Sequence, residues 1–459
     1  MSDAGLEQAR QKMADGGVHP KAIEVFAHYY RELESGATGM IAESDVEPLT
    51  DVPRVADLEV GEHQAAEALA STAVIKLNGG LGTSMGMDRA KSLLAVRGDR
   101  TFLDVIAQQV LATRQAHGCR LPVMFMNSFR TRDDTLAALR RHPELGVDGL
   151  PADFLQNREP KLRADDLTPV QWPDAPQLEW CPPGHGDLYT ALDASGLLRQ
   201  LIEAGYRYAS VSNADNLGAS PSPTVAGWFA ASGAPYAAEV CRRTAADRKG
   251  GHLVRRRGDG QLVLRETAQT RSEDSALAAD IERHPFFHTN NLWFDLRALA
   301  RTLAERDGVL GLPLIRNDKT VDPSDSSTPA VVQVESAMGA AVEVFEGAAA
   351  IEVDRSRFLP VKTTNDLLLM RSDVYDLNGD GLLRLHADAV PYVDLAKQHY
   401  SLLPRFDAHF PAGPPSLAEA TSLTVEGDWT FGADVRVVGD VTLGPAGGSV
   451  ADGEQLSAS

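Results

Sequence analysis

The amino-acid sequence predicts an α/β fold, a sheet with helices on both faces, followed by a short C-terminal β-solenoid. From Thr72 onward, apolar runs short enough to be buried strands alternate with helical patterns, which is typical of such sheets. From Leu423 to Leu443, apolar pairs separated by Gly-Asp or Gly-Ala recur at roughly six-residue spacing, as in hexapeptide repeats. We therefore expect three units: a helical segment at 1–70, the sheet at 71–410, and the β-solenoid with a polar tail at 411–459.

Local signals place the individual elements. An amphipathic helix is expected around 22–33, and the Pro/Asp-rich stretch 47–57 is expected to be a connection. Thr101 can cap a helix that runs through His117. Further strands are expected at 121–126, 206–212, 236–241 and 261–265, and further helices at 133–140 and 188–204.

Composition limits the class of protein. The chain has 459 residues, 43% hydrophobic and 24% charged, as in ordinary globular proteins. Its net charge of −20 argues against nucleic acid or an anionic membrane as partners. Any phosphate binding must therefore come from local positive charge.

Targeting and redox signals favour the cytoplasm. No apolar run approaches the ~20 residues of a membrane helix, and the N-terminus has no signal-peptide pattern. The three cysteines, Cys119, Cys181 and Cys241, are scattered without metal-binding spacing, which suits a reducing compartment.

A glycine-rich turn follows the first predicted strand, 73–77. It contains Gly79, Gly80, Gly82 and Gly86, and Lys91 comes shortly after. Glycines just past a strand let backbone N–H groups approach a phosphate closely, because no Cβ stands in the way. The lysine adds a mobile positive charge, so the stretch predicts a cradle for a triphosphate.

Other interpretations of this turn fit less well. A P-loop needs glycine directly before its lysine, where Ala90 stands, and the dinucleotide pattern G-x-G-x-x-G fails because Gly86 comes one residue late. Residues 82–86 match the G-x-S-x-G elbow of serine hydrolases around Ser84, but no oxyanion loop accompanies them. A turn that binds no ligand is the plain alternative.

Further candidates follow other predicted strands. Asp215 comes just after the strand 206–212, where its carboxylate could hold Mg²⁺, although Asp/Asn clusters are more often turns. Gly184 permits close backbone approach before a helix start, and Gln156 has an amide suited to pairing with a base. Residues 376–381 resemble the start of an EF-hand, but Ala387 occupies the twelfth position where a glutamate is required; we interpret them as a turn.

Several long segments carry a resemblance to one family. LNGGLGTSMG at 77–86 is similar to the nucleotide-binding loop of the eukaryotic-type UTP–glucose-1-phosphate uridylyltransferases (UDP-glucose pyrophosphorylases). So are PPGHGD at 182–187, NADNLG at 213–218, and RSRFLPVKTTNDLLL at 355–369, with Asn365 where serine is common. Two departures stand out. MDRA at 87–90 replaces Cys-Lys-Gly-Pro, which leaves Lys91 as the loop's only lysine, and FHTNNLW at 287–293 has His288 where the family has asparagine.

The resemblance, which runs from about residue 20 to 443, implies both fold and site. The implied fold is a Rossmann-like, GT-A-like nucleotidyltransferase domain with a mixed sheet and a C-terminal left-handed β-helix. The implied reaction joins UTP and glucose 1-phosphate to give UDP-glucose and pyrophosphate, with Mg²⁺ as cofactor. The implied site residues are Lys91 and Lys362 as catalytic lysines; Asp215 as the metal ligand; Leu77, Asn78, Gly79, Gly80, Gln156 and Gly184 at the nucleotide; His185 at the sugar phosphate; and Asn213 and Asn290 at the substrate.

Alternatives remain open at this stage. The chain could prefer another sugar 1-phosphate, or it could be a regulator that binds nucleotide sugars without turnover. The sequence leaves self-association open, and it leaves open whether Arg89 replaces the missing loop lysine.

Overall fold

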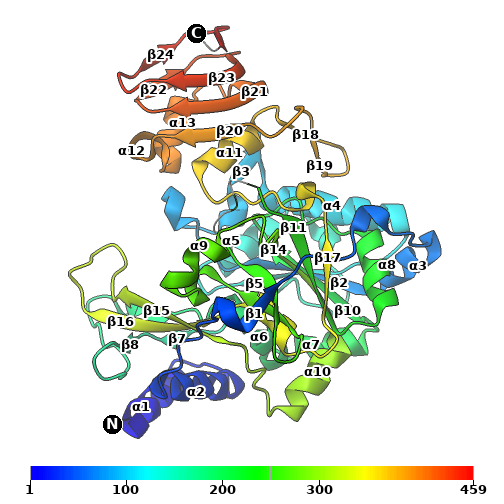
Figure 1. Ribbon diagram of the computed structural model, residues 1–459, viewed down its shortest axis with the longest axis vertical. Helices are drawn as coiled ribbons and strands as arrows, with labels where there is room; N and C mark the ends of the chain where they lie inside the picture. Colours follow the sequence, from blue (N-terminus) through cyan, green and yellow to red (C-terminus); the bar gives the residue numbers. More distant parts are fainter. Residues whose placement is uncertain (1, 245–246, 248–249, 458–459) are drawn as a thin grey trace.

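A mixed sheet forms the centre of the molecule (Figure 1). The computed structural model describes residues 2–244, 247 and 250–457. In this part of the chain, seven strands have the order β17-β11-β14-β10-β2-β5-β6. All neighbours pair in parallel except β14, which is antiparallel to both β10 and β11. Their bounds are β2 (Thr72–Asn78), β5 (Val123–Asn127), β6 (Asp153–Leu155), β10 (Tyr208–Asn213), β11 (Tyr236–Arg242), β14 (Phe286–Asp295) and β17 (Ala349–Glu352).

Helices cover both faces of this sheet, as the sequence predicts. Ala73 and Ile75 of β2 point into a hydrophobic cluster with α6 (Leu188–Ala194), α7 (Leu197–Glu203) and α10 (Leu296–Glu305). Val74 points the opposite way, into a second cluster with helices of the other face, because successive strand residues alternate. These helices are α3 (Glu62–Ala70), α4 (Phe102–His117), α5 (Arg132–Leu139) and α8 (Pro223–Ser232).

Helix boundaries follow local chemistry. Thr101 caps α4, and its hydroxyl and the Asp104 side chain form a capping box, which confirms the predicted start. The single helix expected over 188–204 is wrong: it breaks between α6 and α7, where Gly196 has a φ of +76°. A left-handed residue cannot continue a right-handed helix.

The structure also contains two strands that the sequence did not predict, β12 and β1. The loop expected between 241 and 261 contains β12 (His252–Arg256), which pairs with β13 (Leu262–Arg265). The stretch 47–57, expected as a connection, begins within β1 (Val46–Pro48), which pairs with β12.

The N-terminal helices α1 (Ser2–Asp15) and α2 (Pro20–Glu34) lie at the end of the long axis opposite the C-terminus (Figure 1). Phe26 and Tyr30 of α2 are buried in the same cluster as Leu188 of α6. The N-terminal helices therefore share the core of the central sheet.

Nearby, β15 (Leu314–Thr320), β16 (Ala330–Ser336) and β8 (Leu162–Arg163) form a separate sheet that projects to one side.

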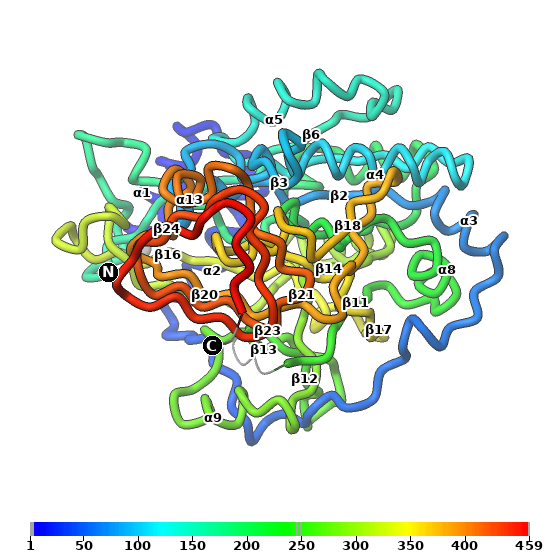
Figure 2. The backbone as a smooth tube through the Cα atoms, turned by 90° about the horizontal axis from the view of Figure 1, so that it is seen from above, coloured from blue at the N-terminus to red at the C-terminus, as the bar shows by residue number. Residues whose placement is uncertain are grey.

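The C-terminal strands stack in parallel at the other end of the molecule (Figures 1 and 2). One sheet has the order β20-β21-β23-β25, and β22 pairs in parallel with β24. Leu423 and Val437 of these strands share a hydrophobic cluster with Leu367. The bounds are β20 (Tyr392–Leu395), β21 (Ser416–Val425), β22 (Trp429–Phe431), β23 (Arg436–Leu443), β24 (Gly448–Val450) and β25 (Gln455–Ser457), with α11 (Thr364–Arg371), α12 (Lys397–Tyr400) and α13 (Leu403–His409) before or between them.

Short elements complete the chain. Residues 378–382 join β18 (Tyr375–Leu377) to β19 (Leu383–Leu385), an antiparallel pair. The EF-hand-like stretch 376–381 therefore begins within β18 and continues as the turn between the two strands. Among the described residues, no helix is both long and apolar enough to cross a bilayer. The remaining elements are β3 (Ala95–Arg97), β4 (Arg100–Thr101), β7 (Glu159–Pro160), β9 (Trp180–Cys181) and α9 (Ser275–Ala278).

A buried histidine makes the fold sensitive to acid. His252 on β12 is 2% exposed, and its ring centroid lies 4.5 Å from that of His284. Burial, together with the nearby cations of His284, Arg243 and Arg265, lowers the pKa of His252 to about 3, against the opposing charge of Glu43. The unfolded chain therefore binds more protons than the folded chain below the ordinary imidazole pKa of about 6.5. Stability is lost as pH falls from that value toward 3.

We expect His252→Leu to flatten this pH dependence. Between about pH 4 and pH 6, the free energy of unfolding of the variant should change by about 1.4 kcal/mol less per pH unit than that of the wild type, because one titrating group is gone. Urea unfolding at several pH values measures the slope. His63→Ala is the control, since that side chain is 87% exposed. Equal slopes for wild type and His252→Leu would contradict the prediction.

Candidate active site

A cavity of about 330 Å³ opens at the carboxyl ends of β2 and β10. Parallel α/β sheets commonly bind ligands at this edge. The residues that line it are Leu77, Asn78, Gly79, Gly80, Lys91, Ser92, Met126, Gln156, Pro182, Gly184, His185, Asn213, Ala214 and Asp215. The cavity therefore contains every predicted site residue except Asn290 and Lys362.

The glycine loop presents its backbone to this cavity. Gly82 and Gly86 have φ values of +66° and +75°, and Lys91 N–H donates to the Gly80 carbonyl at 3.0 Å. A Cβ on Gly79 would lie 2.7 Å from Gln156 Oε1. Asn78 contributes main chain only, because its side-chain amide donates inward to Asn127 Oδ1 at 2.8 Å. The loop thus offers the backbone of Gly79 and Gly80, together with the Lys91 side chain, to a ligand.

Lys91 and Asp215 form an ion pair at the cavity wall. Lys91 Nζ lies 2.6 Å from Asp215 Oδ2, and the two side chains are 15% and 21% exposed. The glycine loop supplies the lysine, and the turn after β10 supplies the aspartate. Two segments of the predicted site that are far apart in sequence therefore meet through opposite charges.

Lys362 lies at the rim of the same region. Its side chain is exposed, and its carbonyl accepts a hydrogen bond from Ser84 Oγ of the glycine loop at 3.4 Å. The preceding Val361 N–H donates to the Asp215 carbonyl at 3.2 Å. Thr363 caps α11 with Asp366 in a capping box. Main-chain contacts therefore hold Lys362 beside both Lys91's loop and Asp215.

Two further polar side chains of the cavity lining are held by hydrogen bonds. His185 Nδ1 accepts the Met338 N–H at 2.9 Å, so the proton of the neutral ring is on Nε2. Burial lowers the pKa of His185 to about 4, which keeps the ring neutral at pH 7. Gln156 Nε2 donates to the Gly184 carbonyl at 3.0 Å. His185 is thus a neutral donor, and Gln156 is oriented by the segment that carries Gly184.

A buried carboxylate lies beneath the site. Glu239 on β11 is fully buried and accepts hydrogen bonds from Arg357 Nε and Nη2, both at 2.8 Å, from Trp293 Nε1 at 2.9 Å and from Asn291 Nδ2 at 3.1 Å. Burial opposes ionisation of Glu239, but the Arg357 charge and these hydrogen bonds lower the pKa of the carboxyl. The buried Glu239 carboxylate therefore has both the opposite charge and the hydrogen bonds that a buried charge requires.

This pair fixes the segment that carries Lys362. The Arg357 carbonyl accepts hydrogen bonds from Asn216 Nδ2 and Asn291 Nδ2, each at 3.1 Å. Asn216 Oδ1 in turn accepts the Leu359 N–H at 2.8 Å. Since Asn216 follows Asp215, the network ties residues 357–361 to the turn that holds the aspartate.

Asn290 lies apart from the cavity lining, in an irregular part of β14. It has a φ of +59°, which is strained for a residue with a side chain. Its neighbour Asn291 is buried, and its side-chain amide donates to Glu239. Asn290 is therefore the asparagine left available to a ligand.

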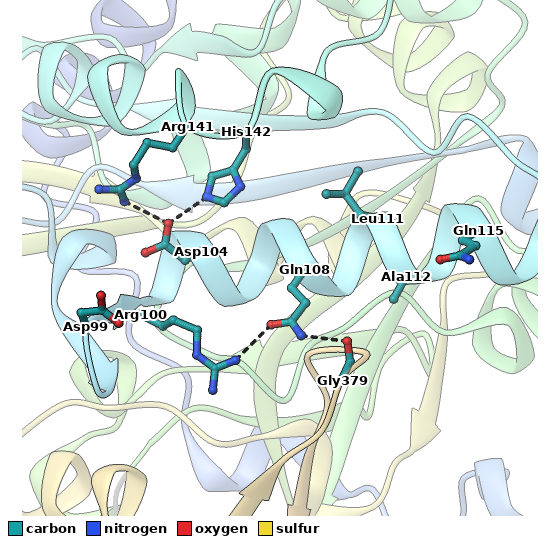
Figure 3. Close-up of a pocket in the computed structure, with 10 residues that line it drawn as sticks. All are labelled: Asp99, Arg100, Asp104, Gln108, Leu111, Ala112, Gln115, Arg141, His142 and Gly379. Atoms are coloured by element: carbon teal, nitrogen blue, oxygen red, sulfur yellow. Dashed lines mark hydrogen bonds and ion pairs between the residues drawn. The ribbon is translucent and has the colours of Figure 1, made fainter.

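A larger hollow elsewhere does not contain any of the predicted site residues (Figure 3). It measures about 630 Å³ and runs along α4 to Gly379. Within it, Asp104 contacts Arg141 at 2.9 Å and His142 at 2.8 Å. Figure 3 shows these contacts and the one between Arg100 and Gln108. We interpret it as a surface groove of the fold.

The donor set at Asp215 fits Mg²⁺. In the part of the chain that is described, no three His, Cys, Asp or Glu side chains are grouped to hold a metal ion. Mg²⁺ does not need such a cage, because it commonly binds one or two carboxylates together with waters and substrate phosphates. Asp215, a partly exposed carboxylate at the cavity wall, is a suitable ligand of that kind.

Sequence reasoning missed the groups buried below the cavity. Glu239 belongs to no motif, and its partner Arg357 is 118 residues away. Lys76, inside the apolar run 73–77, is 1% exposed, and its Nζ donates to Ser212 Oγ and the Ala219 carbonyl, both at 2.8 Å. Burial lowers the pKa of Lys76 to about 7. A charged residue in a buried strand was the one available signal.

Comparisons with known proteins show the class of this protein, which is a nucleotidyltransferase. A family model described as UTP–glucose-1-phosphate uridylyltransferase matches residues 23–438. The chain belongs to this family. The UTP–glucose-1-phosphate uridylyltransferase of Solanum tuberosum is 37% identical over 458 residues, which cover 97% of this chain and 91% of that protein.

Solved structures agree. A UDP-glucose pyrophosphorylase mutant from Leishmania major, in complex with UDP-glucose, has a TM-score of 0.93 and 42% identity, with 99% of this chain and 98% of that chain covered. A UDP-glucose phosphorylase from Trypanosoma brucei has a TM-score of 0.89 and 41% identity, with 99% and 100% covered.

The buried Glu239–Arg357 pair gives a stability prediction. Glu239→Gln should lower the free energy of unfolding by about 3–5 kcal/mol, because it leaves the Arg357 guanidinium without its counter-charge. Arg316→Gln is the control, since its pair with Asp318 is exposed and should contribute about 0–1 kcal/mol. Urea unfolding of both variants measures the difference. Equal small losses in the two variants would show that the buried pair does not stabilise the fold.

Proposed function

We propose that the chain catalyses the reversible reaction of UTP and glucose 1-phosphate to UDP-glucose and pyrophosphate. The observation that carries this proposal is the Lys91–Asp215 pair beside a glycine loop at the sheet edge, in a chain of this family. The UDP-glucose named with the Leishmania structure supports the same product.

The reaction needs no protein nucleophile. An oxygen of the sugar phosphate attacks the α-phosphorus of UTP, a new P–O bond forms, and the bond to the β-phosphate breaks in line with it. Pyrophosphate leaves with the electron pair. The protein's contribution is to position two anions and to stabilise the developing charge.

Each predicted site residue contributes to this positioning or to the neutralisation of charge. The backbone of Gly79 and Gly80 lies against the phosphates, and Lys91 exchanges its contact with Asp215 for a phosphate oxygen. Lys362, at the rim, neutralises charge on the phosphates. Gln156 reads the edge of the uracil, and His185 Nε2 donates to the sugar phosphate, while Asn213 and Asn290 contact the substrate.

Asp215 would hold Mg²⁺, which would supply further neutralisation of the phosphates. We further propose that the protein acts in the cytoplasm, that it binds neither membrane nor nucleic acid, and that the parallel C-terminal strands form a left-handed β-helix. The proposed units are those expected from the sequence, 1–70, 71–410 and 411–459.

Removing Lys362 tests the mechanism. Lys362→Ala should lower kcat by on the order of 10²–10³, the usual cost of removing one electrostatic donor in a transition state. Steady-state pyrophosphate release measures kcat. Lys397→Ala is the matched control, because Lys397 is an exposed lysine on α12. An unchanged kcat in Lys362→Ala would remove the residue from the mechanism.

A substrate survey tests the specificity. Pyrophosphate release should be fastest with UTP and glucose 1-phosphate, because Gln156 and Asn290 are matched to uracil and sugar. The survey compares galactose and N-acetylglucosamine 1-phosphates, and TTP and ATP. Faster turnover of another sugar phosphate would favour a uridylyltransferase of different or broader specificity. Tight UDP-glucose binding without turnover would instead favour a non-catalytic regulator.

A further inference from the structure

The strand β14 bulges where it passes Glu239. His288 pairs with Val240 and Leu292 pairs with Ala238, so residues 289–291 lie opposite Glu239 alone. Bulges of this kind re-aim a side chain. Here the residue at the top of the bulge is Asn290, and its φ of +59° places it in the left-handed region.

Both neighbours of Asn290 are tied to Glu239. Thr289 Oγ1 donates to the Glu239 carbonyl at 2.7 Å, and Asn291 Nδ2 donates to the Glu239 carboxylate at 3.1 Å. These contacts hold the two sides of the bulge. Neither contact fixes the conformation of Asn290 itself, which depends on another side chain.

That side chain is His288. In the tautomer that carries its proton on Nε2, His288 Nδ1 accepts the Asn290 N–H at 3.2 Å. In the other tautomer, Nδ1–H donates to the side-chain oxygen of Asn290 at 3.1 Å, so the ring contacts Asn290 in either state. An acceptor two residues earlier is the geometry by which an asparagine side chain holds a turn. The imidazole therefore provides the hydrogen-bond acceptor that an asparagine side chain can provide at this position, where the resembling family has asparagine.

The ring is held firmly in this role. His288 is 6% exposed, and it packs against Gly339, where a Cβ would lie 2.7 Å from His288 Cε1. In the described part of the chain, Nε2 has no hydrogen-bond partner. A buried polar atom without a partner lowers stability, so an apolar side chain would suit the packing better. What distinguishes the imidazole here is the acceptor at Nδ1.

We propose that His288 is a positioning residue for the sugar: it accepts the Asn290 N–H, holds the bulge in its left-handed form and so aims the Asn290 amide at the sugar hydroxyls. This inference rests on the proposed function, in which Asn290 contacts the sugar. Loss of the acceptor should weaken binding of the sugar part of each ligand and leave binding of the nucleotide part unchanged.

Two substitutions separate the acceptor from the packing. His288→Leu fills similar space without an acceptor, and His288→Asn restores one. Calorimetry gives Kd for UDP-glucose and for UDP with each protein. We expect His288→Leu to raise Kd for UDP-glucose about tenfold, the worth of one hydrogen bond, with Kd for UDP changed less than about twofold. The KM for glucose 1-phosphate should rise with it, while His288→Asn should keep the wild-type ratio of the two Kd values.

Two results would overturn the proposal. The first is an unchanged ratio of the two Kd values in His288→Leu, whether both constants stay the same or rise equally. The second is a His288→Asn protein that behaves like His288→Leu. If His288→Leu does not fold, His288→Ala takes its place with the same expectations. The failure of the proposed function would appear separately, as a wild-type protein that releases no pyrophosphate, because the binding constants need no turnover.

Discussion

The charge of Glu239 is buried below the sheet edge, and the geometry of the site depends on how it is satisfied. A carboxylate without water must be surrounded by donors, and the chain provides them from β14 and from the segment that includes Arg357. These are the segments that carry Asn290 and Lys362. One buried charge thus fixes, through its own partners, the two segments that carry the predicted site residues outside the cavity lining.

Local arrangement, and not overall charge, makes anion binding plausible in this protein. The chain has a net charge of −20, which repels polyanions at long range. Near the sheet edge, however, the Lys91 side chain lies in the cavity wall beside Asp215, and the main chain of Lys362 contacts the glycine loop. Screening weakens distant charges beyond about 10 Å at 0.1 M salt, so a ligand inside the cavity responds mainly to these near neighbours.

The sequence was most informative where a motif coincides with the end of a strand. The glycine loop, Lys91 and Asp215 were predictable because each belongs to a contiguous pattern just after an apolar run, and strand ends meet at one sheet edge. Contacts between distant segments were not, as with Glu239 and Arg357. Lys76 could not be placed because its acceptors, Ser212 and the Ala219 carbonyl, are known only once β10 lies beside β2. The break at Gly196 was overlooked because the apolar pattern continues across it.

The contact between Lys91 and Asp215 has a consequence for selectivity. Two opposite charges 2.6 Å apart already cancel each other, so a lone anion such as chloride or sulfate gains little by approaching either one. A polyphosphate that carries its own divalent cation can exchange partners with the pair, cation to carboxylate and oxygen to ammonium. Under the proposed function, the pairing therefore favours metal-loaded nucleotides over bare inorganic ions.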